Sequence, residues 1–139
     1  METIPLEDRC AIEKLLSDFC WLVDHGEADK VTDLFIEQGK IITPMFTLTG
    51  KDEISHQFEE RQKDKNRVSR HSWSNLRVEN LDHGKVRVMT GVQTYMATGE
   101  MPIVPQNFII GDSIDVVIKG DDGVWLFEER RLVVAFKGE

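Results

Sequence analysis

Four long strand-like segments fill the second half of this 139-residue chain and constrain its fold more than any other feature. They lie at Ser69–Leu81, Lys85–Thr98, Gln106–Lys119 and Val124–Phe136, and each is rich in β-branched and aromatic residues. Segments of turn residues, such as "DHGK" and "GDDG", separate them. Because each segment is roughly twice the usual strand length of about five to six residues, we expect a four-strand antiparallel meander in a strongly curved sheet.

The first half of the chain is mainly helical in pattern. Leu6–His25 carries an apolar stripe at helical spacing and is followed by a natural stop at Gly26; the stripe consists of Ile12, Leu15, Leu16, Phe19, Leu22 and Val23. Shorter helices are expected at Glu27–Phe35 and Lys51–Lys63, with a hairpin at Gly39–Gly50, broken by Pro44, at a sheet edge.

Helices followed by an antiparallel meander predict an α+β fold. We expect a cone-shaped curved sheet wrapped around three N-terminal helices, with an internal pocket. The chain is long enough for one hydrophobic core, so residues 1–139 are expected to form a single domain.

The net charge excludes some classes of binding partner, and the two cysteines indicate the cellular compartment. A formal net charge of −8 argues against a nucleic-acid surface or an anionic membrane, because both need clustered Lys and Arg. No secretory signal and no apolar run long enough for a membrane span is evident. Cys10 and Cys20 lie too far apart along the first helix for a disulfide, so we expect buried thiols and a cytoplasmic protein.

The strand that begins at Ser69 has an unusual polar start. Within "RHSWSN", the side chains of His71, Trp73 and Asn75 are expected on one face, because successive residues of a strand alternate between faces. Such a face is either wet or lines a polar cavity. A curved sheet closed by helices favours the cavity, so we interpret these residues as pocket lining.

Four segments, in this order along the chain, resemble the SnoaL-like domain of the nuclear transport factor 2-like superfamily: "DRCAIEKLLSDFCWLVDHGEADKVTDLF", "GKDEI", "RHSWSN" and "GVWLFEERRLV". The resemblance covers nearly the whole chain, from Leu6 to Phe136. It implies the cone-shaped α+β fold. It leaves the activity open, because this fold serves dehydratases, dehydrochlorinases, isomerases, cyclases and plain binding proteins.

The resemblance also implies a catalytic pair. Scytalone dehydratase and hexachlorocyclohexane dehydrochlorinase carry an aspartate that ends the first helix and a histidine that opens the strand after the third; Asp24 and His71 match these positions. Arg131 keeps the spacing of an arginine in the same relatives from the tryptophan of the last strand. Two positions depart: Phe19 replaces a lysine of the dehydrochlorinase, and Val23 replaces a tyrosine of the scytalone enzyme.

The side-chain chemistry of aspartate and histidine allows this pair to act as a general base. A histidine can act as a general base near neutral pH, and a carboxylate on its other ring nitrogen fixes the tautomer and stabilises the imidazolium. A carboxylate at a helix C-terminus is disfavoured by about 0.3–1 kcal/mol, so Asp24 needs a compensating partner. The alternative interpretation is an exposed Asp24 beside a turn glycine and a His71 that is merely hydrogen-bonded in the sheet.

Other residues are candidates for assisting roles. Asn75, Tyr95 and Arg131 are candidates for stabilising developing negative charge. For Arg131, the alternative is a simple ion pair with Glu129. For Tyr95, the sequence does not determine which face of its strand is concave. Phe19, Trp73 and Phe108 are candidate apolar walls. The sequence shows no zinc-type ligand spacing, no nucleophile motif and no glycine-rich loop, so no metal or cofactor is expected.

The expected function is therefore a cofactor-independent lyase or isomerase, of the dehydratase, dehydrohalogenase or cyclase type, acting on a small hydrophobic molecule of polyketide- or terpenoid-like character. An alternative is a non-catalytic ligand-binding or dimerisation module on the same fold. A third is the small subunit of a ring-hydroxylating dioxygenase, which shows a segment like "RHxxSN". The resemblance also implies a homodimer formed through the outer face of the sheet.

Overall fold

A computed structural model describes residues 3–138 of the chain. The elements, in order, are α1 (Leu6–Asp24), the 3-10 helix η1 (Ala28–Leu34), β1 (Phe35–Ile42), β2 (Thr47–Thr49), α2 (Lys51–Lys63), β3 (Arg67–Asn80), β4 (Lys85–Thr98), β5 (Asn107–Lys119) and β6 (Trp125–Lys137). The α+β class and the four long strands are confirmed close to their predicted bounds.

The sheet has six strands in the order β2-β1-β6-β5-β4-β3. The strands β3 to β6 form the antiparallel meander that the sequence predicts. The hairpin of β1 and β2 forms the edge of the sheet, as expected, but the sheet is mixed and not wholly antiparallel, because β1 pairs parallel with β6. The fully buried ring of Phe35 opens β1 opposite Phe127, so the expected hairpin joins the main sheet.

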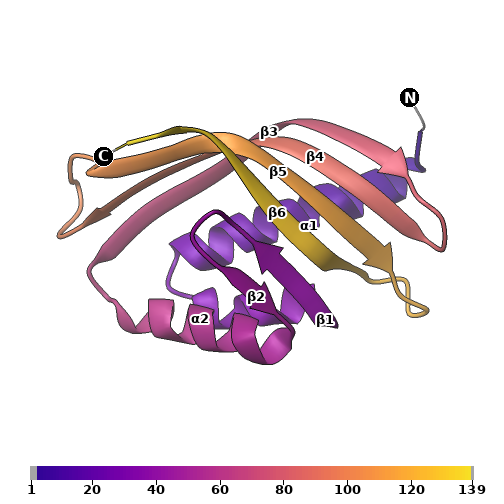
Figure 1. Cartoon of the computed structure of the whole chain (residues 1–139), viewed down its shortest axis with the longest axis horizontal. Coiled ribbons are helices and arrows are strands. Elements are labelled where there is room, and N and C mark those ends of the chain that lie inside the picture. Colours follow the sequence, from indigo (N-terminus) through magenta and orange to yellow (C-terminus); the bar gives the residue numbers. More distant parts are fainter. Residues whose placement is uncertain (1–2, 139) are drawn as a thin grey trace.

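The helices lie against one face of the curved, unclosed sheet, and α1 runs along it beneath β3 to β5 (Figure 1). The predicted stripe of α1 faces this sheet, since Ile12, Leu15, Leu16 and Val23 are buried. The predicted second helix is a 3-10 turn, and Phe35 belongs to β1 instead. After α1, Gly26 adopts a φ of 78°, in the left-handed region that favours glycine, and the chain turns away.

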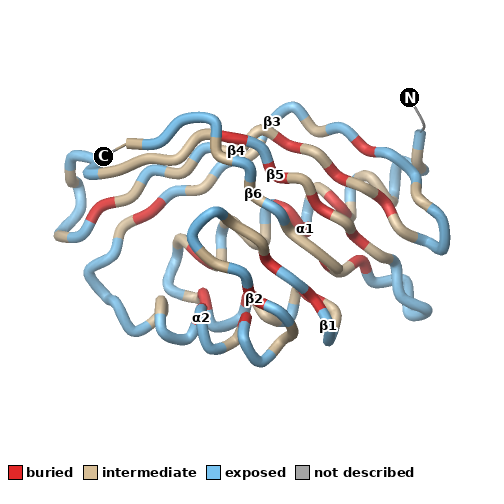
Figure 2. The backbone as a smooth tube through the Cα atoms, viewed as in Figure 1, coloured by how far each residue is buried: buried red, intermediate tan, exposed pale blue. Residues whose placement is uncertain are grey.

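The core fills the space between the two layers, where the buried residues gather (Figure 2). Its largest fully buried apolar side chains are Phe35, Phe127, Ile12, Leu16, Ile54, Val31, Val88 and Val117. The Phe19 ring meets those of Phe35, Phe58 and Phe127 edge-on, with centroids 6.0–6.3 Å apart. Burial of each such side chain contributes about 1.5–3 kcal/mol, so this cluster fixes α1 and α2 against the sheet.

A buried ion pair lies inside this core. Arg130 donates two hydrogen bonds to the fully buried Asp115, at 3.1 and 3.0 Å, and one to Ser113 Oγ at 3.1 Å. Its guanidinium carbon stands 4.5 Å from the ring centroids of Phe19 and Phe127. Arg130 thus occupies the interior of the cone and is held there on every side.

The two cysteines are free thiols. The prediction that both are buried is wrong for Cys10, which is exposed on α1, whereas Cys20 is half-buried. No helix among residues 3–138 combines the length and apolar character that a membrane crossing requires.

Candidate active site

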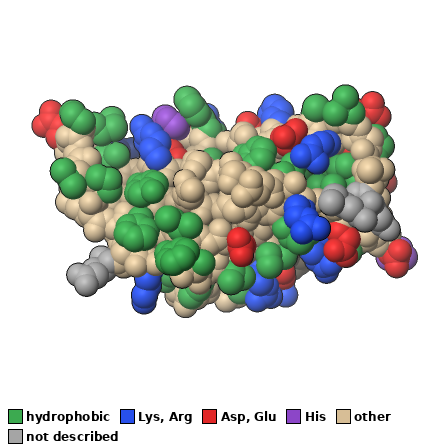
Figure 3. Space-filling model, turned by 90° about the horizontal axis from the view of Figure 1, so that it is seen from above, with side chains coloured by type: hydrophobic (Ala, Val, Ile, Leu, Met, Phe, Trp, Pro, Cys, Tyr) green, Lys and Arg blue, Asp and Glu red, His purple; other side chains and the backbone are tan. Residues whose placement is uncertain are grey.

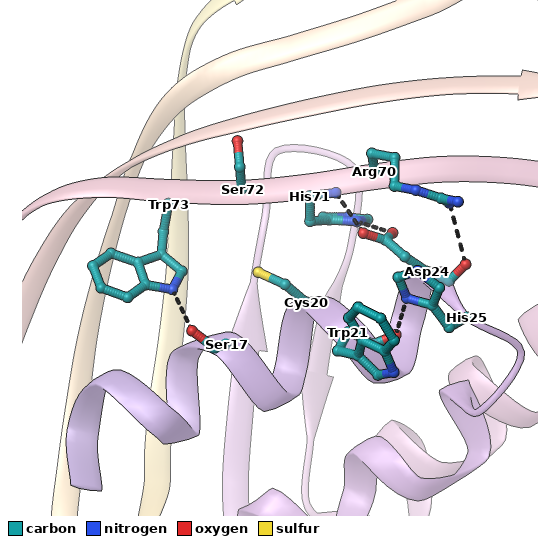
Figure 4. Close-up of a pocket in the computed structure, with 9 residues that line it drawn as sticks. All are labelled: Ser17, Cys20, Trp21, Asp24, His25, Arg70, His71, Ser72 and Trp73. Atoms are coloured by element: carbon teal, nitrogen blue, oxygen red, sulfur yellow. Dashed lines mark hydrogen bonds and ion pairs between the residues drawn. The ribbon is translucent and has the colours of Figure 1, made fainter. Parts of the chain in front are cut away.

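The side chains of Asp24 and His71 meet where the end of α1 faces the edge strand β3 (Figure 4). Asp24 Oδ1 lies 2.6 Å from His71 Nδ1, and Asp24 Oδ2 accepts the backbone N–H of His71 at 2.6 Å. The Asp24 side chain is only 3% exposed, and that of His71 is 24% exposed. The structure therefore brings the predicted pair into direct contact, with the carboxylate behind the imidazole.

These contacts fix the charge of Asp24. Burial by itself raises the pKa of the Asp24 carboxyl, but the hydrogen bonds and charge of His71, together with the Ser69 hydroxyl, outweigh it and hold this pKa below its ordinary value of 3.8. Asp24 is thus an anion at neutral pH. Because a carboxylate can only accept hydrogen bonds, Nδ1 of a neutral His71 must carry the proton, and Nε2 carries the lone pair.

A groove of about 540 Å³ lies between α1 and β3, next to the pair. Its lining residues are Ser17, Cys20, Trp21, Asp24, His25, Arg70, His71, Ser72 and Trp73. Trp21 stacks on His25, with ring centroids 3.7 Å apart, and Trp73 Nε1 donates to Ser17 Oγ at 3.1 Å. The pocket expected inside the cone is therefore open at the side of the sheet in this structure, because Phe19, Phe127 and Arg130 occupy the interior.

Only some of the predicted site residues line this groove. Trp73 does, together with Asp24 and His71. Phe19 lies in the aromatic core cluster. Asn75 is exposed at a bulge of β3 and has a φ of 56°, so the regular alternation that places His71 and Trp73 on one face ends before it.

Three further predicted residues lie on the outer face of the sheet. Tyr95 pairs with Arg70 and Phe108, whereas His71 pairs with Thr94, and directly paired residues share a face. Arg131 is half-exposed and lies 3.8 Å from Glu129, as in the alternative interpretation of an ion pair. The extra residue in β6 at Glu128 shifts the register, so that Arg130 points inward and Arg131 outward.

Sequence reasoning missed Ser69 and Arg70 next to the pair. Ser69 Oγ donates to Asp24 Oδ1 at 2.8 Å, and Arg70 Nη1 donates to the carbonyl oxygens of Ser69 and Asp24 at 2.6 and 3.5 Å. Ser69 stands two residues before His71, so the strand period places it on the same face and could have identified it. Arg70 reaches the groove only because β3 is an edge strand, which the sequence does not reveal.

Cys20 lines the groove but is not an activated nucleophile. Burial raises the pKa of its thiol to about 11, so it carries little thiolate near neutral pH. We therefore expect iodoacetamide at about pH 8 to label the exposed Cys10 first, as measured by mass spectrometry of the digested protein. Both should react alike in urea. Labelling of Cys20 as fast as Cys10 in the folded protein would contradict this.

The depressed pKa of Asp24 predicts a pH-dependent stability. The unfolded carboxyl takes up a proton near pH 3.9 and the folded one only at lower pH, so the unfolded state binds more protons in between. The stabilisation from ionised Asp24 is thus complete well above about pH 4 and is lost as the pH falls through the folded pKa. In urea unfolding, the stability difference between the wild type and Asp24→Asn should shrink as the pH is lowered; a constant difference would contradict this.

No group of three or more His, Cys, Asp or Glu side chains in the described part of the chain, residues 3–138, has an arrangement that could hold a metal ion.

Comparison with known proteins gives one family and several structural relatives. The model of the SnoaL-like domain matches residues 5–131. A candidate scytalone dehydratase from Novosphingobium aromaticivorans is 24% identical, with a TM-score of 0.83 over 96% of this chain and 87% of that one. A hexachlorocyclohexane dehydrochlorinase, LinA type 2, is 19% identical, with a TM-score of 0.79 over 96% and 88%.

ActVI-ORFA from Streptomyces coelicolor is 15% identical, with a TM-score of 0.79 over 93% of this chain and 98% of that one. No curated protein matches the chain in sequence. At these identities the similarity to solved structures shows the fold alone.

Proposed function

The chain belongs to the SnoaL-like domain family, and on this premise we propose that it is a cofactor-independent lyase or isomerase in which His71 is the general base. The observation that carries the proposal is the buried Asp24 carboxylate on His71 Nδ1, 2.6 Å away. This contact leaves the Nε2 lone pair free, since Nε2 has no hydrogen-bond partner among the described residues.

The proposed step is removal of a proton from a carbon next to an activating group. His71 Nε2 takes the proton, and the electron pair of the broken C–H bond forms a double bond. In an elimination, the neighbouring carbon loses either halide or a hydroxyl group, and the hydroxyl leaves as water after taking a proton from the His71 imidazolium. In an isomerisation, the imidazolium returns the proton to another carbon and the double bond has migrated. The Asp24 anion stabilises the imidazolium that forms, and such a base contributes about 10²–10⁴ in rate.

The groove suggests what the substrate is like. Its volume of about 540 Å³ suits one small molecule, and Trp21, Trp73 and His25 offer aromatic surface to an apolar or planar ring. Arg70 donates to two uncharged carbonyl oxygens, so its positive charge remains available to a developing enolate or a leaving anion. We assign this assistance to Arg70, because Asn75 and Arg131 do not line the groove. A polyketide- or terpenoid-like compound fits this description.

The test is a screen of small cyclic substrates that can lose water or halide, or isomerise, with products followed by mass spectrometry. Turnover that disappears in His71→Asn supports the proposal. Turnover that persists in this variant contradicts it. Ligands that bind equally well to both proteins, with no product over the whole panel, would indicate a non-catalytic binding module.

We also propose a homodimer through the outer face of the sheet. Hydrophobic side chains gather on this face toward the end of the sheet where the chain ends (Figure 3), and Tyr95, Val133 and Phe136 are 43%, 45% and 66% exposed. Free thiols at Cys10 and Cys20 are compatible with the cytoplasm as the compartment.

The dimer proposal predicts a concentration-dependent mass that falls to that of a monomer in Phe136→Glu. Sedimentation equilibrium measures this. A wild-type protein that stays monomeric at high concentration would contradict the proposal.

A further inference from the structure

Two linked hydrogen bonds, from Arg61 to Ser69 and from Ser69 to Asp24, reach the Asp24 carboxylate from the side away from the groove. Ser69 Oγ lies 2.8 Å from Asp24 Oδ1, and Arg61 Nη2 lies 2.9 Å from Ser69 Oγ. Ser69 is only 4% exposed. None of the steps proposed for the reaction uses Arg61 or Ser69.

The chemistry of the three groups fixes which of them donates and which accepts in each hydrogen bond. A guanidinium can only donate hydrogen bonds, and a carboxylate can only accept them. Arg61 therefore donates to Ser69 Oγ, and the Ser69 hydroxyl must turn its own proton toward Asp24 Oδ1. The carboxylate then accepts three hydrogen bonds, from the Ser69 hydroxyl, from His71 Nδ1 and from the His71 backbone N–H.

Arg61 is itself held in place by the last turn of α2. The neighbouring Gln62 accepts the backbone N–H of Ala28 at 2.9 Å and donates to the carbonyl oxygen of Gly26, so this turn is fixed to the loop that follows Asp24. Burial, and next the charge of Arg67, lower the pKa of Arg61 to about 10. The guanidinium is still protonated at neutral pH and keeps donating.

We propose that Arg61 and Ser69 are positioning residues, which hold the Asp24 carboxylate in the orientation that fixes the Nδ1–H tautomer of His71. This inference rests on the proposed function of the pair. Neither residue lines the groove; both line a separate rear cavity of about 170 Å³, together with Asp24, Gln62 and Arg67. They therefore act through Asp24 and not on a ligand in the groove.

The experiment measures the neutral tautomer of His71 by long-range ¹H–¹⁵N NMR correlation, with the signal assigned from its loss in His71→Asn. We expect Ser69→Ala and Arg61→Gln each to raise the ratio of the Nε2–H to the Nδ1–H form by about two- to tenfold. This is the change in an equilibrium that the loss of one net hydrogen bond causes. Ser69→Thr retains the hydroxyl and should keep the wild-type ratio. Arg67→Gln is the matched control, because Arg67 lines the same rear cavity but bonds Met96 Sδ at 3.9 Å.

Asp24→Asn separates this inference from the proposed function. A ratio that moves in Asp24→Asn but not in Ser69→Ala or Arg61→Gln overturns the positioning role and leaves the proposed base intact. A ratio unmoved in Asp24→Asn overturns the proposed pair, and the inference falls with it. Should Ser69→Ala not fold, the ratio in Arg61→Gln decides in the same way. An equal shift in Arg67→Gln would show a general effect of charge and would overturn the assignment.

Discussion

His71→Asn is expected to lower kcat by about 10²–10⁴-fold on any substrate that the protein turns over, because the variant has no base at the position of Nε2. Asn fills a similar space and can still donate to Asp24, so the fold should be retained. KM should change little, since the groove keeps its indole walls at Trp21 and Trp73. Steady-state kinetics, with circular dichroism to check folding, measures both quantities.

The matched control for this prediction is His83→Asn. His83 lies in the exposed turn between β3 and β4, with a φ of 65°, a conformation that asparagine tolerates well. It should retain wild-type kcat and KM. If His71→Asn keeps kcat within a factor of about ten of the wild type, general-base catalysis of the expected size is absent.

Asp115→Leu is expected to lower the free energy of unfolding by about 3–5 kcal/mol, which is the cost of leaving one partner of a buried ion pair uncompensated. Asp115 is fully buried, and the Arg130 side chain is only 11% exposed. The guanidinium carbon of Arg130 also lies 4.5 Å from the ring centroids of Phe19 and Phe127, so without Asp115 its charge would face mainly apolar surface. Urea unfolding measures the loss.

A double variant shows whether the loss comes from the unpaired charge. Asp115→Leu with Arg130→Met replaces both partners by apolar side chains of similar size, which is often neutral or stabilising. The double variant should therefore be more stable than Asp115→Leu alone. A double variant that is less stable than the single one would mean that packing, and not the stranded charge, causes the loss.

The sequence predicts the elements of this fold well because their patterns are local. The stripe of α1, the bounds of α2 and the four long strands follow from side-chain periodicity and turn residues. The position of β1 in the sheet cannot be predicted from such local patterns, because its parallel pairing with β6 joins residues far apart in the chain, such as Phe35 and Phe127. Nothing in "FIEQGKII" states which strand it will join.

In the candidate site, too, local patterns predict some residues and only the tertiary structure reveals others. The family resemblance identifies Asp24 and His71, and the two-residue period of a strand places Ser69 on the same face as His71. Regular alternation predicts Asn75 on the face of His71, and the family spacing from Trp125 selects Arg131, but bulges in β3 and β6 interrupt the alternation of both strands. Since one extra residue moves every later side chain to the other face, "RR" at 130–131 could not reveal which arginine points inward. Arg61 comes from a helix, and only the tertiary structure brings it to Ser69.

The proposed function requires that Asp24 holds His71 with its proton on Nδ1 and its lone pair on Nε2. The most direct measurement is the ¹⁵N chemical shift of both ring nitrogens of His71 in the wild-type protein, at a pH where the imidazole is neutral. We expect a protonated Nδ1, bonded to the carboxylate, and an unprotonated Nε2. A His71 that carries its proton on Nε2 would contradict this expectation, because Asp24 would then face a lone pair and the ring would have no free base on the side away from it.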